Sequence, residues 1–184
     1  MKILFLHGLE GSPDGTKAQY LKKEYDAYTP ILDTSELIAL KNAEPTGEWT
    51  SINRGIIIAA SRVPLQQARE ALVEYDPDVI IGSSMGGALL AKLVKEHMWM
   101  GPCIFLASAA KLMFGIGSVT CRYGVPLKWV HGYDDDVIPV THSMNDAQES
   151  HGTCHLVHDD HRLESLVESG MLKELVEDAI SEMV

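Results

Sequence analysis

The chain has 184 residues, and its 15 Lys and Arg against 26 Asp and Glu give a formal net charge of −11. This length suits one domain, and an apolar content of 46% with 22% charged residues is typical of a globular rather than a disordered chain. An acidic surface repels polyanions, so nucleic acid and anionic membranes are poor candidate partners. We therefore expect residues 1–184 to form a single domain.

Cysteine usage and the first residues predict a cytoplasmic protein. Cys103, Cys121 and Cys154 are odd in number and widely spaced, without a C-x-x-C pair, which favours a reducing compartment. The apolar run Ile3–Leu6 is too short for the core of a signal peptide. No run approaches the eighteen apolar residues of a transmembrane helix, so we expect no membrane partner.

The first third of the chain starts with a clear strand and then becomes hard to interpret. Lys2–His7 is an apolar run that predicts a strand, and Gly8–Gly15 is a loop rich in glycine, serine and proline. Apolar residues then recur at helical spacing over residues 18–25. Residues 30–62 have no clear pattern, and within them Ile56–Ala60 could form a buried strand or a helix.

The remainder alternates regularly between helix and strand patterns. A helix is expected from Pro64 to Tyr75, a strand over Asp78–Ser83 and a helix over Met85–Met98. Further strands are expected at Cys103–Ala107, Leu127–His131 and Thr153–Val157, before a helix from about Leu163 with apolar residues Leu163, Leu166, Val167, Leu175, Ala179 and Ile180. Apolar strands separated by helices predict an α/β fold with a doubly wound, mostly parallel sheet and helices on both faces.

The strongest motif is G-S-S-M-G at residues 82–86, a G-x-S-x-G pattern between an expected strand and an expected helix. In that context the central serine sits on a strained turn that exposes its hydroxyl, and its neighbours at ±2 must be small. The motif therefore predicts that Ser84 is a nucleophile. The alternative is a glycine-rich turn that only packs tightly or holds a phosphate.

A serine nucleophile needs a general base and an acid that orients the base. The run Asp134–Asp136 follows one expected strand, and His158 and His161 follow the last one. Sites in open α/β sheets form at these carboxyl ends, so acid and base candidates are present in a suitable order. His7 and His131 each precede a glycine at a strand end, and we expect both to support loop backbones.

Several segments resemble the α/β-hydrolase superfamily. H-G-Y-D-D-D-V-I-P at residues 131–139 resembles the acid loop of small α/β-hydrolase esterases. The opening L-F-L-H-G-L-E-G-S-P-D-G-T-K-A, G-S-S-M-G-G and D-D-H-R-L are similar to segments of the small YqiA/YcfP-type serine esterases. The resemblance spans nearly the whole chain, although residues 30–62 and 108–126 carry no matching motif.

This resemblance implies a minimal α/β-hydrolase fold with a Ser-His-Asp triad and no cofactor. Ser84 would be the nucleophile, Asp135 the acid and His161 the base, and the backbone N–H groups of Leu9 and Met85 would form the oxyanion hole. The expected function is hydrolysis of small carboxylic esters or thioesters through an acyl-enzyme, with a small-molecule acyl substrate as partner. A peptidase or acyltransferase would use the same triad, and a binding protein could retain the fold without turnover.

The chain leaves room for neither an obvious metal site nor a large cap. His151, His155, His158 and His161 are dense, but they cross a strand and a loop, where their spacing does not converge on one face, so no metal is expected. Ser108–Pro126 is too short for a cap domain. Its apolar residues Met113, Phe114 and Ile116 are expected to roof part of an acyl pocket, which favours short or flexible acyl groups.

Overall fold

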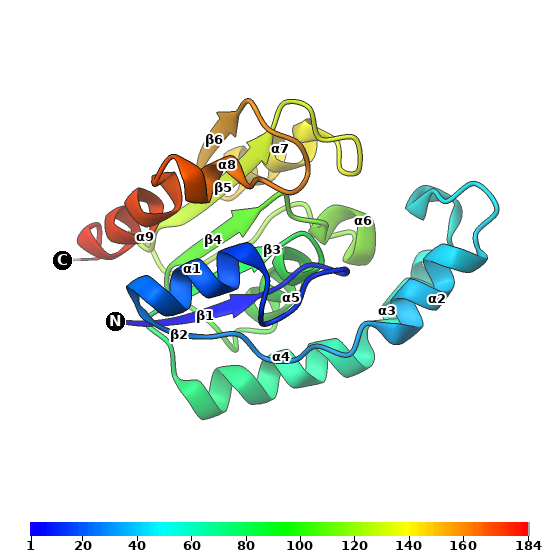
Figure 1. Ribbon diagram of the computed structural model, residues 1–184, viewed down its shortest axis with the longest axis horizontal. Coiled ribbons are helices and arrows are strands. Elements are labelled where there is room, and N and C mark those ends of the chain that lie inside the picture. Colours follow the sequence, from blue (N-terminus) through cyan, green and yellow to red (C-terminus); the bar gives the residue numbers. More distant parts are fainter. Residues whose placement is uncertain (184) are drawn as a thin grey trace.

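The apolar runs of the sequence are buried in the middle of one sheet. In the computed structural model, which describes residues 1–183, the strands are β1 (Lys2–Leu6), β2 (Asp26–Tyr28), β3 (Val79–Ser83), β4 (Cys103–Leu106), β5 (Leu127–Gly132) and β6 (Thr153–Val157). Every pairing is parallel, and the order is β2-β1-β3-β4-β5-β6 (Figure 1). The predicted parallel sheet is confirmed. The short edge strand β2 was not expected, because its residues are exposed or only half-buried.

Helices cover both faces because alternate side chains of each strand point to opposite sides. In β1, Leu4 and Leu6 belong to one core, and Ile3 and Phe5 belong to the other. The first core includes residues of α2 (Ser35–Ala43), α3 (Arg54–Ala60), α4 (Arg62–Tyr75), α5 (Met85–Lys95), α6 (Ala110–Phe114) and α7 (Val140–Glu149). The second includes α1 (Thr16–Glu24), α8 (Ser165–Glu168) and α9 (Met171–Ser181). Within residues 1–183, no helix has the length and apolar character needed to cross a bilayer.

The strand order creates a crevice at one place on the carboxyl edge of the sheet. After β1 the chain pairs β2 on one side, and it then crosses to β3 on the other side of β1. The connections after β1 and β3 therefore leave the sheet in opposite directions. In open α/β sheets, such a switch point is where ligands bind.

Residues 30–62, which the sequence left unassigned, lie largely beyond the carboxyl ends of the strands (Figure 1, cyan). They form α2, the short 3₁₀ turn η1 (Trp49–Ser51) and α3. Of the two alternatives for Ile56–Ala60, the helix is observed. The Asn53 side chain begins this helix by accepting a hydrogen bond from the Gly55 N–H at 2.8 Å.

Two of the predicted helices end or divide at positions that the sequence did not indicate. The helix expected over Met85–Met98 ends at Lys95. The backbone leaves the helical path at His97, whose φ is 56°. The helix expected from Leu163 was wrong, because the segment divides into α8 and α9 at Gly170, whose φ is 80°. Leu163 itself has φ 51° and lies in a turn. Its side chain is nevertheless fully buried, which explains its fit to the apolar pattern.

Candidate active site

Ser84 lies on the tight turn between β3 and α5. Its φ and ψ are 53° and −112°, a conformation that residues other than glycine rarely adopt. The surrounding backbone fixes it: the Ser84 N–H donates to the Leu106 carbonyl at 2.8 Å, and the Ser84 carbonyl accepts from Ala88 and Ala109 at 3.2 and 3.0 Å. The turn is therefore held in place by both β4 and α5.

The glycines of the motif are required by the close approach of α5 to the sheet. A Cβ on Gly86 would lie 1.9 Å from the Leu6 carbonyl oxygen, and one on Gly82 would lie 2.5 Å from the Gly86 carbonyl oxygen. Both contacts are with backbone atoms, which cannot swing away as a flexible side chain can. The motif thus sets the position of Ser84 through packing as well as through the turn.

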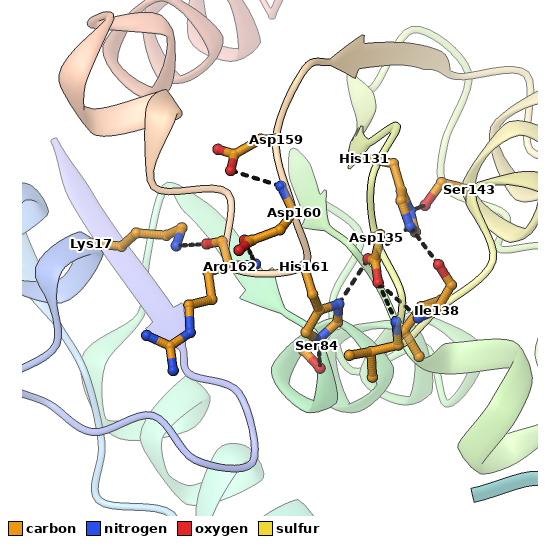
Figure 2. A network of polar contacts seen from close by, with 11 residues as sticks. Lys17, Ser84, His131, Asp135, Ile138, Ser143, Asp159, Asp160, His161 and Arg162 are labelled. Carbon is orange, nitrogen blue, oxygen red and sulfur yellow. Dashed lines mark hydrogen bonds and ion pairs between the residues drawn. The ribbon is translucent and has the colours of Figure 1, made fainter. Parts of the chain in front are cut away.

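Three of the predicted residues form one chain of hydrogen bonds (Figure 2). The Ser84 hydroxyl lies 2.9 Å from His161 Nε2, and His161 Nδ1 lies 2.7 Å from Asp135 Oδ2. The other carboxylate oxygen, Oδ1, accepts the backbone N–H groups of Val137 and Ile138, each at 2.8 Å. A carboxylate can only accept here, so Nδ1 of His161 carries a proton and Nε2 faces the serine as an acceptor.

The loops that carry Asp135 and His161 meet at Gly132. A Cβ at this position would lie 2.1 Å from the Asp159 carbonyl oxygen. The same oxygen accepts the Asp134 N–H at 3.1 Å, which joins the two loops. Glycine at the end of β5 therefore permits the loops that carry Asp135 and His161 to pack against each other.

Acidic side chains order the backbone around His161. Asp159 accepts the N–H groups of Asp160 and Ser165, and Asp160 accepts that of Arg162, all at 2.7–2.8 Å. On the opposite side, the Lys17 ammonium group of α1 donates to the Arg162 carbonyl (Figure 2). The His161 ring is thus presented by a loop that is braced from two directions.

The electrostatic environment keeps Asp135 ionised. Its side chain is fully buried, which by itself would raise the pKa of the carboxyl group. Hydrogen bonds from His131, from His161 and from the Ile138 N–H outweigh burial and hold the pKa well below its usual range. Asp135 therefore stays a charged acceptor for His161 at neutral pH.

The other candidates for the acid and the base do not take part in the hydrogen bonds that link Asp135, His161 and Ser84. Asp134 and Asp136 are exposed, and within residues 1–183 neither carboxylate hydrogen-bonds a histidine. His158 is exposed as well, and its ring packs against Tyr133 with centroids 5.2 Å apart. The structure brings Asp135 and His161 to Ser84, and these three side chains take no part in that set of hydrogen bonds, although Asp136 lines the cavity beside it.

The loop after β1 lies directly beside the serine. A Cβ on Gly8 would be 3.4 Å from Ser84 Cβ. Buried His7 shapes the loop: Nδ1 donates to the Gly8 carbonyl at 2.8 Å, and Nε2 accepts the Leu32 N–H at 3.4 Å. Burial lowers the pKa of His7 against the opposing bond to Gly8, so the ring keeps this neutral arrangement. His7 supports the loop backbone, as expected.

The two predicted oxyanion donors lie in the wall of the cavity beside Ser84. Met85 is the first residue of α5, so its N–H has no acceptor within the helix. Leu9 follows Gly8 in the loop after β1. Both residues are therefore near the serine, on the two loops that diverge at the switch point.

The cavity over Ser84 has a volume of about 520 Å³. Leu37 and Trp49 line it from the 30–62 region, and Leu112 and Met113 line it from α6. The expectation for residues 108–126 therefore holds only in part: Met113 reaches the cavity, whereas Phe114 and Ile116 pack against the core. Sequence reasoning missed Leu37 and Trp49, because nothing in their surroundings indicated that this region folds over the crevice.

Sequence reasoning also missed a contact of His131. Its Nε2 lies 3.0 Å from the Ile138 carbonyl, the loop-supporting role that was expected, but also 2.9 Å from Asp135 Oδ2. Its place at the end of β5 puts His131 near Asp135 along the chain, but the sequence alone does not show that the two side chains meet.

The histidines near the last strand lie apart. His151 is in the turn after α7, and His155 is on β6, with its Nε2 3.5 Å from Thr153 Oγ1. Of the dense cluster in the sequence, His161 alone contacts Ser84. In the described part of the chain, no three His, Cys, Asp or Glu side chains lie close enough together to hold a metal ion.

Comparison with known proteins places this geometry on a known fold. Neither the protein-family models nor the curated proteins gave a match. Among solved structures, a candidate α/β-superfamily hydrolase from Xanthomonas campestris pv. campestris superposes with a TM-score of 0.66 at 24% identity, covering 98% of both chains. The ydeN gene product of B. subtilis gives 0.66 at 15% identity, also over 98% of both chains. Est1E from Butyrivibrio proteoclasticus with ferulic acid bound gives 0.63 at 14%, over 99% of this chain and 89% of the other. The chain therefore has the α/β-hydrolase fold.

Proposed function

We propose that this protein is a serine hydrolase that cleaves small carboxylic esters or thioesters through an acyl-enzyme. The observation that carries the proposal is the continuous set of hydrogen bonds from Asp135 through His161 to Ser84. The α/β-hydrolase fold of the relatives supports a hydrolase in general. The narrower resemblance to YqiA/YcfP-type esterases remains a prediction.

In the first step, Ser84 Oγ attacks the acyl carbonyl carbon while its proton passes to His161 Nε2. Asp135 holds the opposite ring nitrogen in its protonated form and stabilises the imidazolium that results. The leaving alcohol or thiol then takes the proton from His161. Water attacks the acyl-serine in the second half of the reaction, again losing its proton to Nε2, which regenerates the free serine.

The negative charge that develops on the carbonyl oxygen needs donors already in place. The backbone N–H groups of Leu9 and Met85 are the proposed pair, since both line the cavity beside Ser84. A single donor of this kind is typically worth ~2.7–4 kcal/mol in the transition state. Because these donors belong to the backbone, a side-chain substitution at either position does not remove them.

Cavity size and lining support small acyl groups. A volume of about 520 Å³ lies within the range of ordinary small-molecule sites. Leu37, Trp49 and Met113 give it apolar walls, and it also contains charged side chains such as Lys41 and Glu10, which pair with each other at 3.1 Å. An apolar wall of this extent suits a short or flexible acyl chain better than a long one.

Ester hydrolysis across a chain-length series tests the proposal. Purified wild type should hydrolyse p-nitrophenyl acetate and butyrate faster than the decanoate, and a short acyl thioester offered in parallel reports the preferred leaving group. Ser84→Ala should be inactive on every substrate while retaining its circular dichroism spectrum. Faster turnover of the decanoate would refute the short-chain preference. Absence of any turnover by folded wild type would favour the binding-protein alternative, and cleavage of amides alone would favour a peptidase.

A further inference from the structure

A second histidine contacts the carboxylate of Asp135 on the side away from the serine (Figure 2). His131 stands at the end of β5, and its side chain is fully buried. Its Nε2 lies 2.9 Å from Asp135 Oδ2 and 3.0 Å from the Ile138 carbonyl oxygen. Oδ2 therefore faces two histidine nitrogens, Nδ1 of His161 and Nε2 of His131.

Ser143 fixes the orientation of the His131 ring. Ser143 lies on α7, is itself buried, and places its Oγ 2.7 Å from His131 Nδ1. Both groups facing Nε2 are acceptors, so Nε2 carries the proton and is the donor. In this neutral tautomer Nδ1 accepts the Ser143 hydroxyl. The ring is thus held at both nitrogens and cannot turn without losing a buried hydrogen bond.

We propose that His131, oriented by Ser143, is a positioning residue of the catalytic machinery that aims the Asp135 carboxylate at His161 and limits its pull on the His161 proton. The inference rests on the proposed hydrolase function. The hydrogen-bond path then extends over five side chains from three strand ends and α7, in the order Ser143, His131, Asp135, His161 and Ser84.

The His131 N–H is the fourth donor to the Asp135 carboxylate, and it has two consequences. With two backbone N–H groups on Oδ1 and two ring N–H groups on Oδ2, both oxygens are fully engaged and the plane of the carboxylate cannot rotate. A donor from His131 also withdraws charge from the oxygen that His161 uses. Without that donor, Oδ2 would carry more negative charge and hold the protonated His161 ring more tightly.

Other titratable groups near this pair are few. His142 on α7 interacts electrostatically with His131, and Lys111 on α6 in turn faces His142 and Asp146. His161 from the loop after β6 faces Asp135. A change in the pH profile caused by substituting His131 must therefore be compared with variants that leave these groups intact.

Substitution of His131 by glutamine and by phenylalanine separates the donor from the volume of the ring. Gln places an amide N–H at about the position of Nε2, and Phe fills the space without a donor. Relative to wild type, His131→Phe should lower kcat by about ten- to hundredfold, as expected for a lost hydrogen bond to a charged group. It should also shift the acidic limb of the kcat/KM profile to higher pH. His131→Gln should restore most of kcat and the wild-type limb.

Two further variants keep the test decisive. Ser143→Ala removes only the hydroxyl, so it tests the same path if His131→Phe does not fold, and it should give a smaller loss of kcat with a shift in the same direction. His155→Phe places the same substitution on the neighbouring strand, outside the path, and should leave kcat and the profile unchanged.

Fluorophosphonate labelling of Ser84 distinguishes failure of this inference from failure of the proposed function. If wild type is labelled but folded His131→Phe and Ser143→Ala match it in rate and profile, His131 does not act on Asp135. A loss of kcat without any movement of the acidic limb, or with movement to lower pH, would likewise overturn the inference, because it would indicate a displaced loop. If wild type is not labelled, both the function and the inference are refuted.

Discussion

Replacing Asp135 by asparagine removes one charge while nearly preserving the shape of the side chain. The two backbone N–H groups of Val137 and Ile138 require an acceptor at the Oδ1 position. The amide oxygen must stay there, so the new NH₂ group takes the place of Oδ2. It then faces the proton on His161 Nδ1, and two donors oppose each other. His161 avoids this clash when its proton moves from Nδ1 to Nε2. In that tautomer Nε2 can no longer accept the proton of Ser84.

The size of the effect follows from this forced tautomer. In serine proteases with a Ser-His-Asp triad, the same substitution lowers kcat by about 10⁴-fold, and Asp135→Asn should lower kcat to a similar extent. Stability should fall less, by about 1.5–3 kcal/mol for the lost charged acceptor. His131 keeps its bond to the Ile138 carbonyl in the variant, which limits the cost.

The assay compares three variants of the acidic run at matched concentration. Initial rates with p-nitrophenyl acetate give kcat, and urea unfolding gives the change in stability. Asp134→Asn and Asp136→Asn are the controls, since both side chains are exposed, and each should stay within a few-fold of wild type. A loss below tenfold for Asp135→Asn, or an equal loss for either control, would refute the assignment of Asp135.

Three other expectations follow from the geometry. Gly86→Ala should destabilise the fold by about 3 kcal/mol or more in urea unfolding, because its Cβ would fall 1.9 Å from a backbone carbonyl of β1. Gly47→Ala, which meets open space, should cost only the roughly 1–2 kcal/mol of its positive φ; equal losses would count against the packing argument. His161→Ala should abolish ester hydrolysis, whereas His158→Ala should retain most of it, and the reverse would mean that His158 is the base. The depressed pKa of Asp135 should stabilise the fold fully above the unfolded-chain pKa of about 3.9, and this contribution should disappear as the pH falls toward the lower folded-state pKa. The difference in unfolding free energy between wild type and Asp135→Asn should accordingly narrow below pH 4; a constant difference would contradict the shift.

Most of the sheet could be predicted from the sequence because its central strands are buried. Runs such as Val79–Ser83 and Cys103–Leu106 are apolar on both faces, so they stand out without a homologous sequence. The edge strand β2 could not be recognised in this way, since it lies at the margin of the sheet and Asp26 and Tyr28 are exposed. Its pairing with β1 is a tertiary property with no local signal.

The region from α2 to α3 escaped prediction for a related reason. In α2 only Leu37 is buried, and η1 has no buried residue, so neither carries a recognisable apolar period. Trp49 nevertheless lines the cavity. The roof of the site is therefore formed in part by residues whose role depends on long-range packing over the crevice.

The segment after β6 was predicted as a helix because its apolar residues have helical spacing. The carboxylates of Asp159 and Asp160 instead capture the backbone N–H groups that a helix would leave free at its start. Gly170 then interrupts the helical path with a positive φ. These local hydrogen bonds favour a loop in spite of the helical spacing of the apolar residues, and they hold the loop that carries His161.

For the candidate site, the order of motifs along the sequence indicated the main residues, but it did not indicate which side chains contact one another from neighbouring loops. Ser84, Asp135 and His161 could be selected from motifs that follow strand ends. The contact between His131 and Asp135 depends on how the acid loop folds back over β5, which sequence spacing does not reveal.

The most direct test of the central claim is fluorophosphonate labelling followed by intact-mass measurement of wild type and Ser84→Ala. A reactive serine at the end of β3 predicts one adduct on the wild type and none on the variant, with both proteins folded. An adduct on both proteins would place the reactive group elsewhere. No adduct on folded wild type would show that the hydrogen bonds from Asp135 to Ser84 do not activate the serine, and the proposed hydrolase function would be wrong.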